Sequence, residues 1–141
     1  MITLPAIPRA WLRWAIIAGG LTVFFWLRLE DHGVLTAVLM GLALTVLALA
    51  SGWWPRSAGK ALSPVRLALF MAVTGAAAGL FTALASALLM LLKNGFHGHL
   101  YPDYPAPLIG ETIARAPAWA LAGALAGIAA ALLLLARRRR G

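Results

Sequence analysis

Residues 67–92, LALFMAVTGAAAGLFTALASALLMLL, form an apolar stretch without a single charged side chain. A helix needs about 20 such residues to cross a hydrocarbon core of about 30 Å, so this stretch is long enough to span a membrane. Residues 34–54 and 116–136 repeat the pattern. Residues 14–27 form a shorter stretch, and Arg13 and Arg28 are expected to reach towards the headgroups at its two ends. The sequence therefore predicts four transmembrane helices.

The composition agrees with a membrane location. Hydrophobic residues make up 62% of the chain and charged residues only 11%, whereas soluble domains carry about 25% charged residues. A water-soluble domain of 141 residues cannot bury so many apolar side chains, because its surface is too large for its volume. The absence of cysteine excludes disulfides and thiolate chemistry. We expect an all-α, multi-pass membrane protein with a single domain over residues 1–141.

Local signals place the four helices at about residues 10–29, 34–54, 65–93 and 117–136, arranged in two hairpins. Pro55 ends the second helix, because proline cannot continue the backbone hydrogen bonds. Ser63 and Pro64 suit the cap and first turn of the third helix. Lys93 is expected in the last turn of that helix, with Gly95 just beyond it. Residues 94–116 form the longest connection, and its second half predicts a short interfacial helix over residues 107–115.

Basic residues are distributed unevenly between the two ends of these helices. Nine of the twelve Lys and Arg flank the N-terminus, the second connection and the C-terminus, while all four acidic residues fall in the other two connections. Positively charged segments stay in the cytoplasm, so we expect both termini there, in a cell inner membrane. The net charge of +8 fits anionic headgroups of the bilayer and no nucleic acid. Four cations directly after the last helix are the predicted lipid anchor: Arg137, Arg138, Arg139 and Arg140.

Two GxxxG motifs lie in the third and fourth predicted helices. They consist of Gly75 with Gly79 and of Gly123 with Gly127. Small residues four positions apart form a shallow groove in which two helix backbones can approach closely. The motifs therefore predict helix packing, either of these two helices on each other or against a second copy or a partner subunit.

The connection between those helices carries the side chains best suited to chemistry. His97 and His99 are two residues apart, so their rings point the same way in an extended backbone, and Asp103 follows closely. Two imidazoles and a carboxylate can bind Zn²⁺ or Cu²⁺, and Glu30, Asp31 and His32 would join them if the first connection folds towards the third. The alternative is a solvated polar loop at the headgroup boundary. No other cofactor is predicted.

The predicted spans offer few groups for catalysis or ion transport. Proton relays and coupled transport usually need an ionisable side chain at depth, and the predicted helix cores contain no Asp, Glu, His or Lys. Their only polar groups at depth are hydroxyls that can bond to their own backbone. These hydroxyls belong to Thr22, Thr36, Thr45, Thr74, Thr82 and Ser86. We therefore expect no enzyme, but a small non-catalytic subunit, assembly factor or stabilising factor of a larger membrane complex, or a self-associating chain. The alternative is a small transporter or channel component that handles a metal ion through His97 and His99. A membrane enzyme with a site in the outer connections ranks last.

Overall fold

The structure is a computed structural model that describes residues 2–98 and 101–138. Within these residues, four helices are long and apolar enough to cross a membrane, which confirms the predicted all-α class. The α-helices are α1 (Arg9–Arg28), α2 (Val34–Ala48), α3 (Pro64–His97), α4 (Ala106–Ala114) and α5 (Ala116–Arg138). Two short strands, β1 (Ile2–Thr3) and β2 (Ala61–Leu62), pair in antiparallel register.

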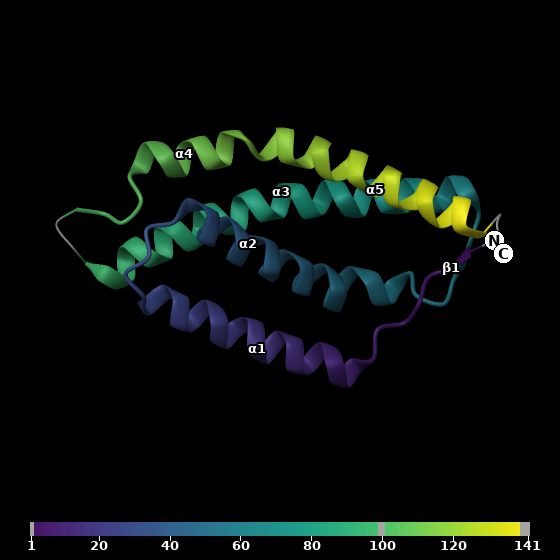
Figure 1. Cartoon of the computed structure of the whole chain (residues 1–141), viewed down its shortest axis with the longest axis horizontal. Helices are drawn as coiled ribbons and strands as arrows, with labels where there is room; N and C mark the ends of the chain where they lie inside the picture. Colours follow the sequence, from purple (N-terminus) through teal and green to yellow (C-terminus); the bar gives the residue numbers. More distant parts are fainter. Residues whose placement is uncertain (1, 99–100, 139–141) are drawn as a thin grey trace.

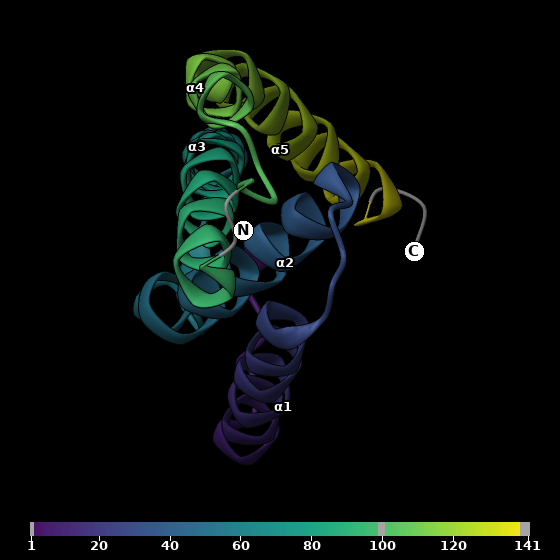
Figure 2. The same cartoon turned by 90° about the vertical axis from the view of Figure 1, so that its left-hand side faces the viewer.

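Helix α3 is the centre of the arrangement. It packs along α5 on one side and along α2 on another, and it also meets α4 and one end of α1. Figure 2 shows α1 standing farthest from α5. The division into two hairpins and the side of the membrane that holds the termini stay predictions.

The end of α2 departs from regular α-helix. A π-helical turn, η1 (Leu49–Trp53), and a 3₁₀ turn, η2 (Trp54–Arg56), continue it to the loop before α3. Pro55 lies within the 3₁₀ turn, and the chain leaves the helix at Ser57. The sequence predicted a helix over residues 34–54 that stops at Pro55, whereas the regular α-helix ends earlier, at Ala48, and the irregular turns run past Pro55 to Arg56.

Helix α3 begins where the sequence suggested and ends later. The Ser63 hydroxyl accepts a hydrogen bond from the Arg66 backbone N–H at 3.4 Å, so Ser63 caps the helix. The helix passes the expected end at Lys93 and the glycine at 95, and it stops at His97 before Gly98, whose φ of 55° is left-handed. Glycine inside a helix costs about 1 kcal/mol. Tertiary hydrogen bonds of the Lys93 and Asn94 side chains hold the extra turn in place.

The connection after α3 is consequently short, and α4 forms close to the predicted interfacial helix. Only Arg115 separates α4 from α5, and the Trp119 backbone N–H donates to the Arg115 carbonyl at 3.1 Å. The two helices therefore follow one another almost without interruption (Figure 1).

Two hydrophobic cores lie at opposite ends of the bundle. One surrounds Trp26, Met90 and Tyr104, where the connections α1–α2 and α3–α4 meet. The other brings Leu4 against Leu67 of α3 and Ala131 of α5. The first and last described residues thus lie at the same end (Figure 1).

Candidate functional site

Polar side chains, most of them buried or half-buried, gather at the end of the bundle opposite the termini. They come from α1, from the connection α1–α2, from the last turns of α3, and from the segment before α4. We call this group the polar cluster: Trp26, Asp31, His32, Lys93, Asn94, His97, Asp103 and Tyr104.

Lys93 belongs to the polar cluster and has none of its surface exposed. Its ammonium group donates to the Trp26 carbonyl at 3.3 Å and lies 4.3 Å from the centre of the Trp26 ring. A buried charge is costly unless nearby groups compensate it, and a carbonyl oxygen and an aromatic face both do so. The sequence pattern suggested a cation in the final turn of the helix, whereas Lys93 lies one turn earlier and points inwards.

The sequence contained a signal for this inward position. Ser86, Met90 and Lys93 are separated by three or four residues, the spacing that places side chains on one helix face, and all three are buried. Once the helix continues past Lys93, this residue belongs to the buried stripe. The sequence pattern did not predict a buried lysine here, because a lysine in the last turn of a helix that ends at residue 93 would be exposed.

Asp31 faces the same region from the connection α1–α2. Its carboxylate accepts hydrogen bonds from Trp26 Nε1 at 3.0 Å and from the Gly33 backbone N–H at 2.8 Å. These bonds, together with the positive charge of Lys93, lower the pKa of Asp31 below its usual value. Asp31 is therefore a carboxylate near neutral pH, and it offsets part of the Lys93 charge.

Tyr104 joins three segments of the chain and is fully buried. Its hydroxyl group donates towards the Gly33 and Asp31 carbonyls, at 3.2 and 3.4 Å. The Asn94 side chain pairs with the Tyr104 backbone in both directions, at 2.7 and 2.9 Å. Burial, and then the charges of Asp31 and Asp103, raise the pKa of Tyr104 to about 12.

The Asp103 carboxylate contacts two histidines. His97 Nδ1 contacts Oδ2, and His32 Nδ1 lies 3.3 Å from Oδ1. The Asp103 side chain is only 3% exposed, while that of His32 is 63% exposed. Burial alone would raise the pKa of Asp103, but contact with His97 and the charges of His32 and Lys93 outweigh it, so this pKa lies below its usual value.

The predicted metal ligands are thus brought together in part. His97 and Asp103 meet, and the first connection folds towards the third, so that His32 joins them. His99 lies outside the described residues. Across residues 2–98 and 101–138, no group of three or more His, Asp or Glu is arranged to hold a metal ion. The metal site at His97, His99 and Asp103 stays a prediction.

The four glycines of the GxxxG motifs lie where α3 crosses α5. A Cβ atom on Gly75 would overlap the Gly123 carbonyl, and one on Gly127 would overlap the Met71 carbonyl. Gly79 faces the Trp119 carbonyl in the same way. In this chain the motifs therefore bring two helix backbones into direct contact. A groove of about 530 Å³ runs beside them, between α2 and α5, and small residues line much of it.

The predicted lipid anchor is described only in its first half. Arg137 and Arg138 are exposed in the last turn of α5. Arg139 and Arg140 lie outside the described residues.

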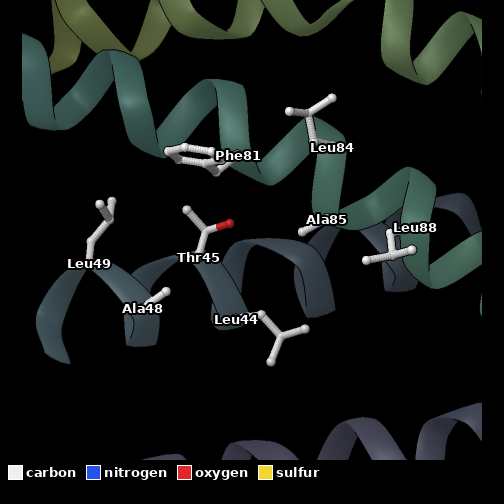
Figure 3. A pocket seen from close by; sticks show the side chains of 8 residues that line it. All are labelled: Leu44, Thr45, Ala48, Leu49, Phe81, Leu84, Ala85 and Leu88. Atoms are coloured by element: carbon white, nitrogen blue, oxygen red, sulfur yellow. The ribbon is translucent and has the colours of Figure 1, made fainter. Parts of the chain in front are cut away.

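A second groove, of about 440 Å³, separates α2 from α3 (Figure 3). Apart from Thr45, its lining is aliphatic or aromatic, and it includes Leu44, Phe81 and Leu88. Thr45 is 4% exposed, and its hydroxyl has no hydrogen-bond partner among the described residues. Other helical hydroxyls donate to the carbonyl four residues earlier, as Thr82 does to Ala78 at 2.7 Å. The groove suits a lipid acyl chain.

Comparison with known proteins gives no match. Neither a scan against protein-family models, nor a search of curated proteins, nor a search of solved structures found one. The polar cluster and the packing of the helices are therefore the basis for a functional proposal.

Proposed function

We propose that this chain is a small non-catalytic integral membrane protein that serves as a subunit, assembly factor or stabilising factor of a larger membrane complex. The observation that carries the proposal is the way in which the bundle uses its buried ionisable groups. Two contacts of these groups join elements that are distant in sequence: Lys93 donates to the Trp26 carbonyl, and Asp103 contacts His32. Asp31 accepts a hydrogen bond from Trp26 at the same end of the bundle.

The polar cluster has the properties of a structural clasp. Lys93 ties α3 to α1, Tyr104 ties the segment before α4 to the connection α1–α2, and Asn94 fixes the backbone of Tyr104. A catalytic or transport group needs access to a substrate, whereas Lys93 and Tyr104 are fully buried. Their hydrogen bonds support a role in holding the end of the bundle together.

The groove between α2 and α5 supports the proposal that the chain has a partner helix. Its walls include Ala78, Ala122 and Ala126, and short side chains let another backbone approach closely in lipid. Trp119 and Leu42 at its borders supply larger contact surfaces. We infer that a transmembrane helix of the complex, or of a second copy, packs in this groove.

Mild extraction from native membranes tests the proposal. After crosslinking, the wild-type chain is expected to migrate with a larger membrane protein or with itself. Ala126→Phe, which fills the groove, should lower the recovered complex about tenfold, whereas Leu133→Phe, on an exposed face of the same helix, should not. A lone chain in every sample would contradict the proposal.

Orientation belongs to the same proposal. The excess of Lys and Arg at the end that holds the termini supports a cytoplasmic position for both, in a cell inner membrane. A reporter fused after Gly141 is expected to be active in the cytoplasm, and one inserted at Pro102 outside it. The reverse pattern would overturn the assignment.

The contact of His32 and His97 with Asp103 favours a second candidate, a small transporter or channel component that handles a metal ion. Here His97, His99 and Asp103 would receive the ion at the mouth of the bundle. Zn²⁺ or Cu²⁺ should bind the wild-type chain and enter liposomes that contain it. Unchanged binding by the His97→Ala/His99→Ala variant would eliminate this candidate.

A further inference from the structure

Helix α1 separates from the rest of the bundle towards its beginning. Its buried residues, Val23, Trp26 and Leu27, all lie in its last turns. Gly19 marks a close approach to α2, because a Cβ atom there would lie 2.6 Å from Leu47 Cδ1. Before this point α1 diverges from α2 (Figures 1 and 2), and Trp14 is 72% exposed. A wedge therefore opens between the two helices.

A cavity of about 470 Å³ lies at the wide end of this wedge. Arg9 and Leu12 of α1 line one side, and Ser51 and Pro55 from the irregular end of α2 line the other. Irregular helical turns often shape functional sites, because they redirect side chains that a regular helix would place elsewhere.

The walls of the cavity are held in place by hydrogen bonds from the connections. Trp54 Nε1 donates to the Pro5 carbonyl at 2.9 Å, and the Gly59 backbone N–H donates to the Leu4 carbonyl at 3.0 Å. These bonds join the segment before α1 to the loop before α3. The separation of α1 from α2 at this end is therefore built into the fold.

The cavity carries positive charge that no carboxylate of the chain offsets. Arg9 lines it. Arg56 directly follows the lining residue Pro55, and its Nη1 lies 3.9 Å from the place that a Cβ atom on Gly52 would take. The chain has four acidic residues, and all of them lie in α4 or in the connections at the opposite end. A negative ligand would be attracted to this end of the molecule.

The cavity also lies at the depth of lipid headgroups. The twenty residues of α1 span about 30 Å, which matches the hydrocarbon core, so Arg9 at one end stands near the phosphate level. The apolar wedge runs from the cavity towards the membrane centre, where acyl chains are. Basic pockets between transmembrane helices bind anionic lipid headgroups by this combination.

We propose that this cavity is a binding site for an anionic phospholipid. Arg9 and Arg56 hold the phosphate, and the acyl chains fill the wedge between α1 and α2. The lipid acts as a structural ligand that closes the gap left by the divergence of α1. The site is separate from the groove between α2 and α5, so it does not depend on the proposed partner helix.

Purified full-length chain in detergent provides the test. Native mass spectrometry should show more dioleoylphosphatidylglycerol than dioleoylphosphatidylcholine bound to each chain. The Arg9→Gln/Arg56→Gln variant should lose about tenfold in affinity for phosphatidylglycerol, because two attractive charges are removed. The matched control is Lys60→Gln/Arg66→Gln, which removes the same charge at the same end without changing a residue that lines the cavity, and it should stay within about twofold.

Three results would overturn the proposal. An equal loss in the control variant would show general attraction to positive charge. Equal binding of the two phospholipids would show that the headgroup charge is not recognised. Displacement of the lipid by millimolar inorganic phosphate would show a free-anion site. All four mutated residues are exposed, so the variants are expected to fold, and the mass spectra report on the folded molecule directly.

Discussion

The ammonium group of Lys93 lies where an uncompensated charge would be costly, and its neighbours compensate it. We expect Lys93→Met to destabilise the chain by about 1 kcal/mol, because the change keeps the stem but removes the hydrogen bond to the Trp26 carbonyl and a positive charge near Asp31 and Asp103. Lys60→Met, at an exposed position, should change stability by less than about 0.5 kcal/mol. Denaturant unfolding in detergent micelles measures both. Equal effects would contradict a compensating role for Lys93.

Thr45 presents the opposite case, a buried hydroxyl without a hydrogen-bond partner among the described residues. Replacing an unpaired polar group by an apolar one of similar shape removes a desolvation penalty, so Thr45→Val should stabilise the chain by about 1 kcal/mol. Thr82→Val removes a hydrogen bond to Ala78 and should cost about 1 kcal/mol. Thermal unfolding of the two variants compares them. Destabilisation by Thr45→Val would mean that its hydroxyl is paired in the membrane.

The buried phenol of Tyr104 predicts a dependence on alkaline pH. Its pKa is raised to about 12, so the folded chain keeps a proton that the unfolded chain releases near its usual value of about 10. Stability from this group is present below about pH 10 and is lost as the pH rises towards 12. In the Tyr101→Phe variant, Tyr104 is the one remaining tyrosine, and its phenolate absorbance should titrate with a midpoint near 12. A midpoint near 10 would contradict the burial of Tyr104.

Among the elements, α3 and α5 show the tightest packing, which their glycines permit. A Cβ atom on Gly123 would overlap the Gly75 carbonyl, and backbone cannot move aside as a flexible side chain can. We expect Gly123→Ala to cost about 3 kcal/mol, the upper part of the range for overpacking. Gly20→Ala, in α1 with open space around it, should instead stabilise the chain by about 0.5 kcal/mol. Thermal unfolding in micelles measures the pair, and a tolerated Gly123→Ala would show that the helices separate in the membrane.

Most element bounds follow from local chemistry, and the sequence predicts them well. Ser63 and Pro64 act through a cap and backbone geometry, which neighbouring residues alone determine. The end of α3 is different. Local signals at Lys93 and Gly95 suggest a stop, but the contact of Lys93 with Trp26, which is far away in the sequence, and that of Asn94 with Tyr104 in the next segment carry the helix on to His97.

The same distinction applies to the candidate site. The pairing of His97 with Asp103 joins two residues of one short segment, and their chemical types and close spacing are enough to predict that they meet. The inward position of Lys93 and the bridge made by Tyr104 depend on how the connection α1–α2 folds onto α3. Such contacts require the tertiary arrangement of the helices, which hydrophobic stretches alone do not specify.

At the scale of the whole molecule, the two ends differ in how α1 is held. At one end, Lys93 and the buried side chains of α1 fix it to the bundle, and at the other end, among the described residues, hydrogen bonds of the short segment before Arg9 hold it. The chain has no cysteine, so pairs of spin labels can be introduced without background. The pair Trp14→Cys/Trp53→Cys reports on the splayed end, where α1 diverges from α2, and the pair Phe25→Cys/Leu35→Cys reports on the clasped end, which holds the polar cluster. All four positions are exposed.

In phosphatidylcholine nanodiscs, the distance distribution between labels should be broad at the splayed end and narrow at the clasped end. Added phosphatidylglycerol should narrow the first distribution, because a lipid seated in the wedge supports α1 from the side that lacks protein contacts. The same addition should leave the clasped end unchanged, since hydrogen bonds already fix it. In the Arg9→Gln/Arg56→Gln background, the narrowing should disappear. Equally narrow distributions at both ends without anionic lipid would show that α1 needs no lipid to hold its position.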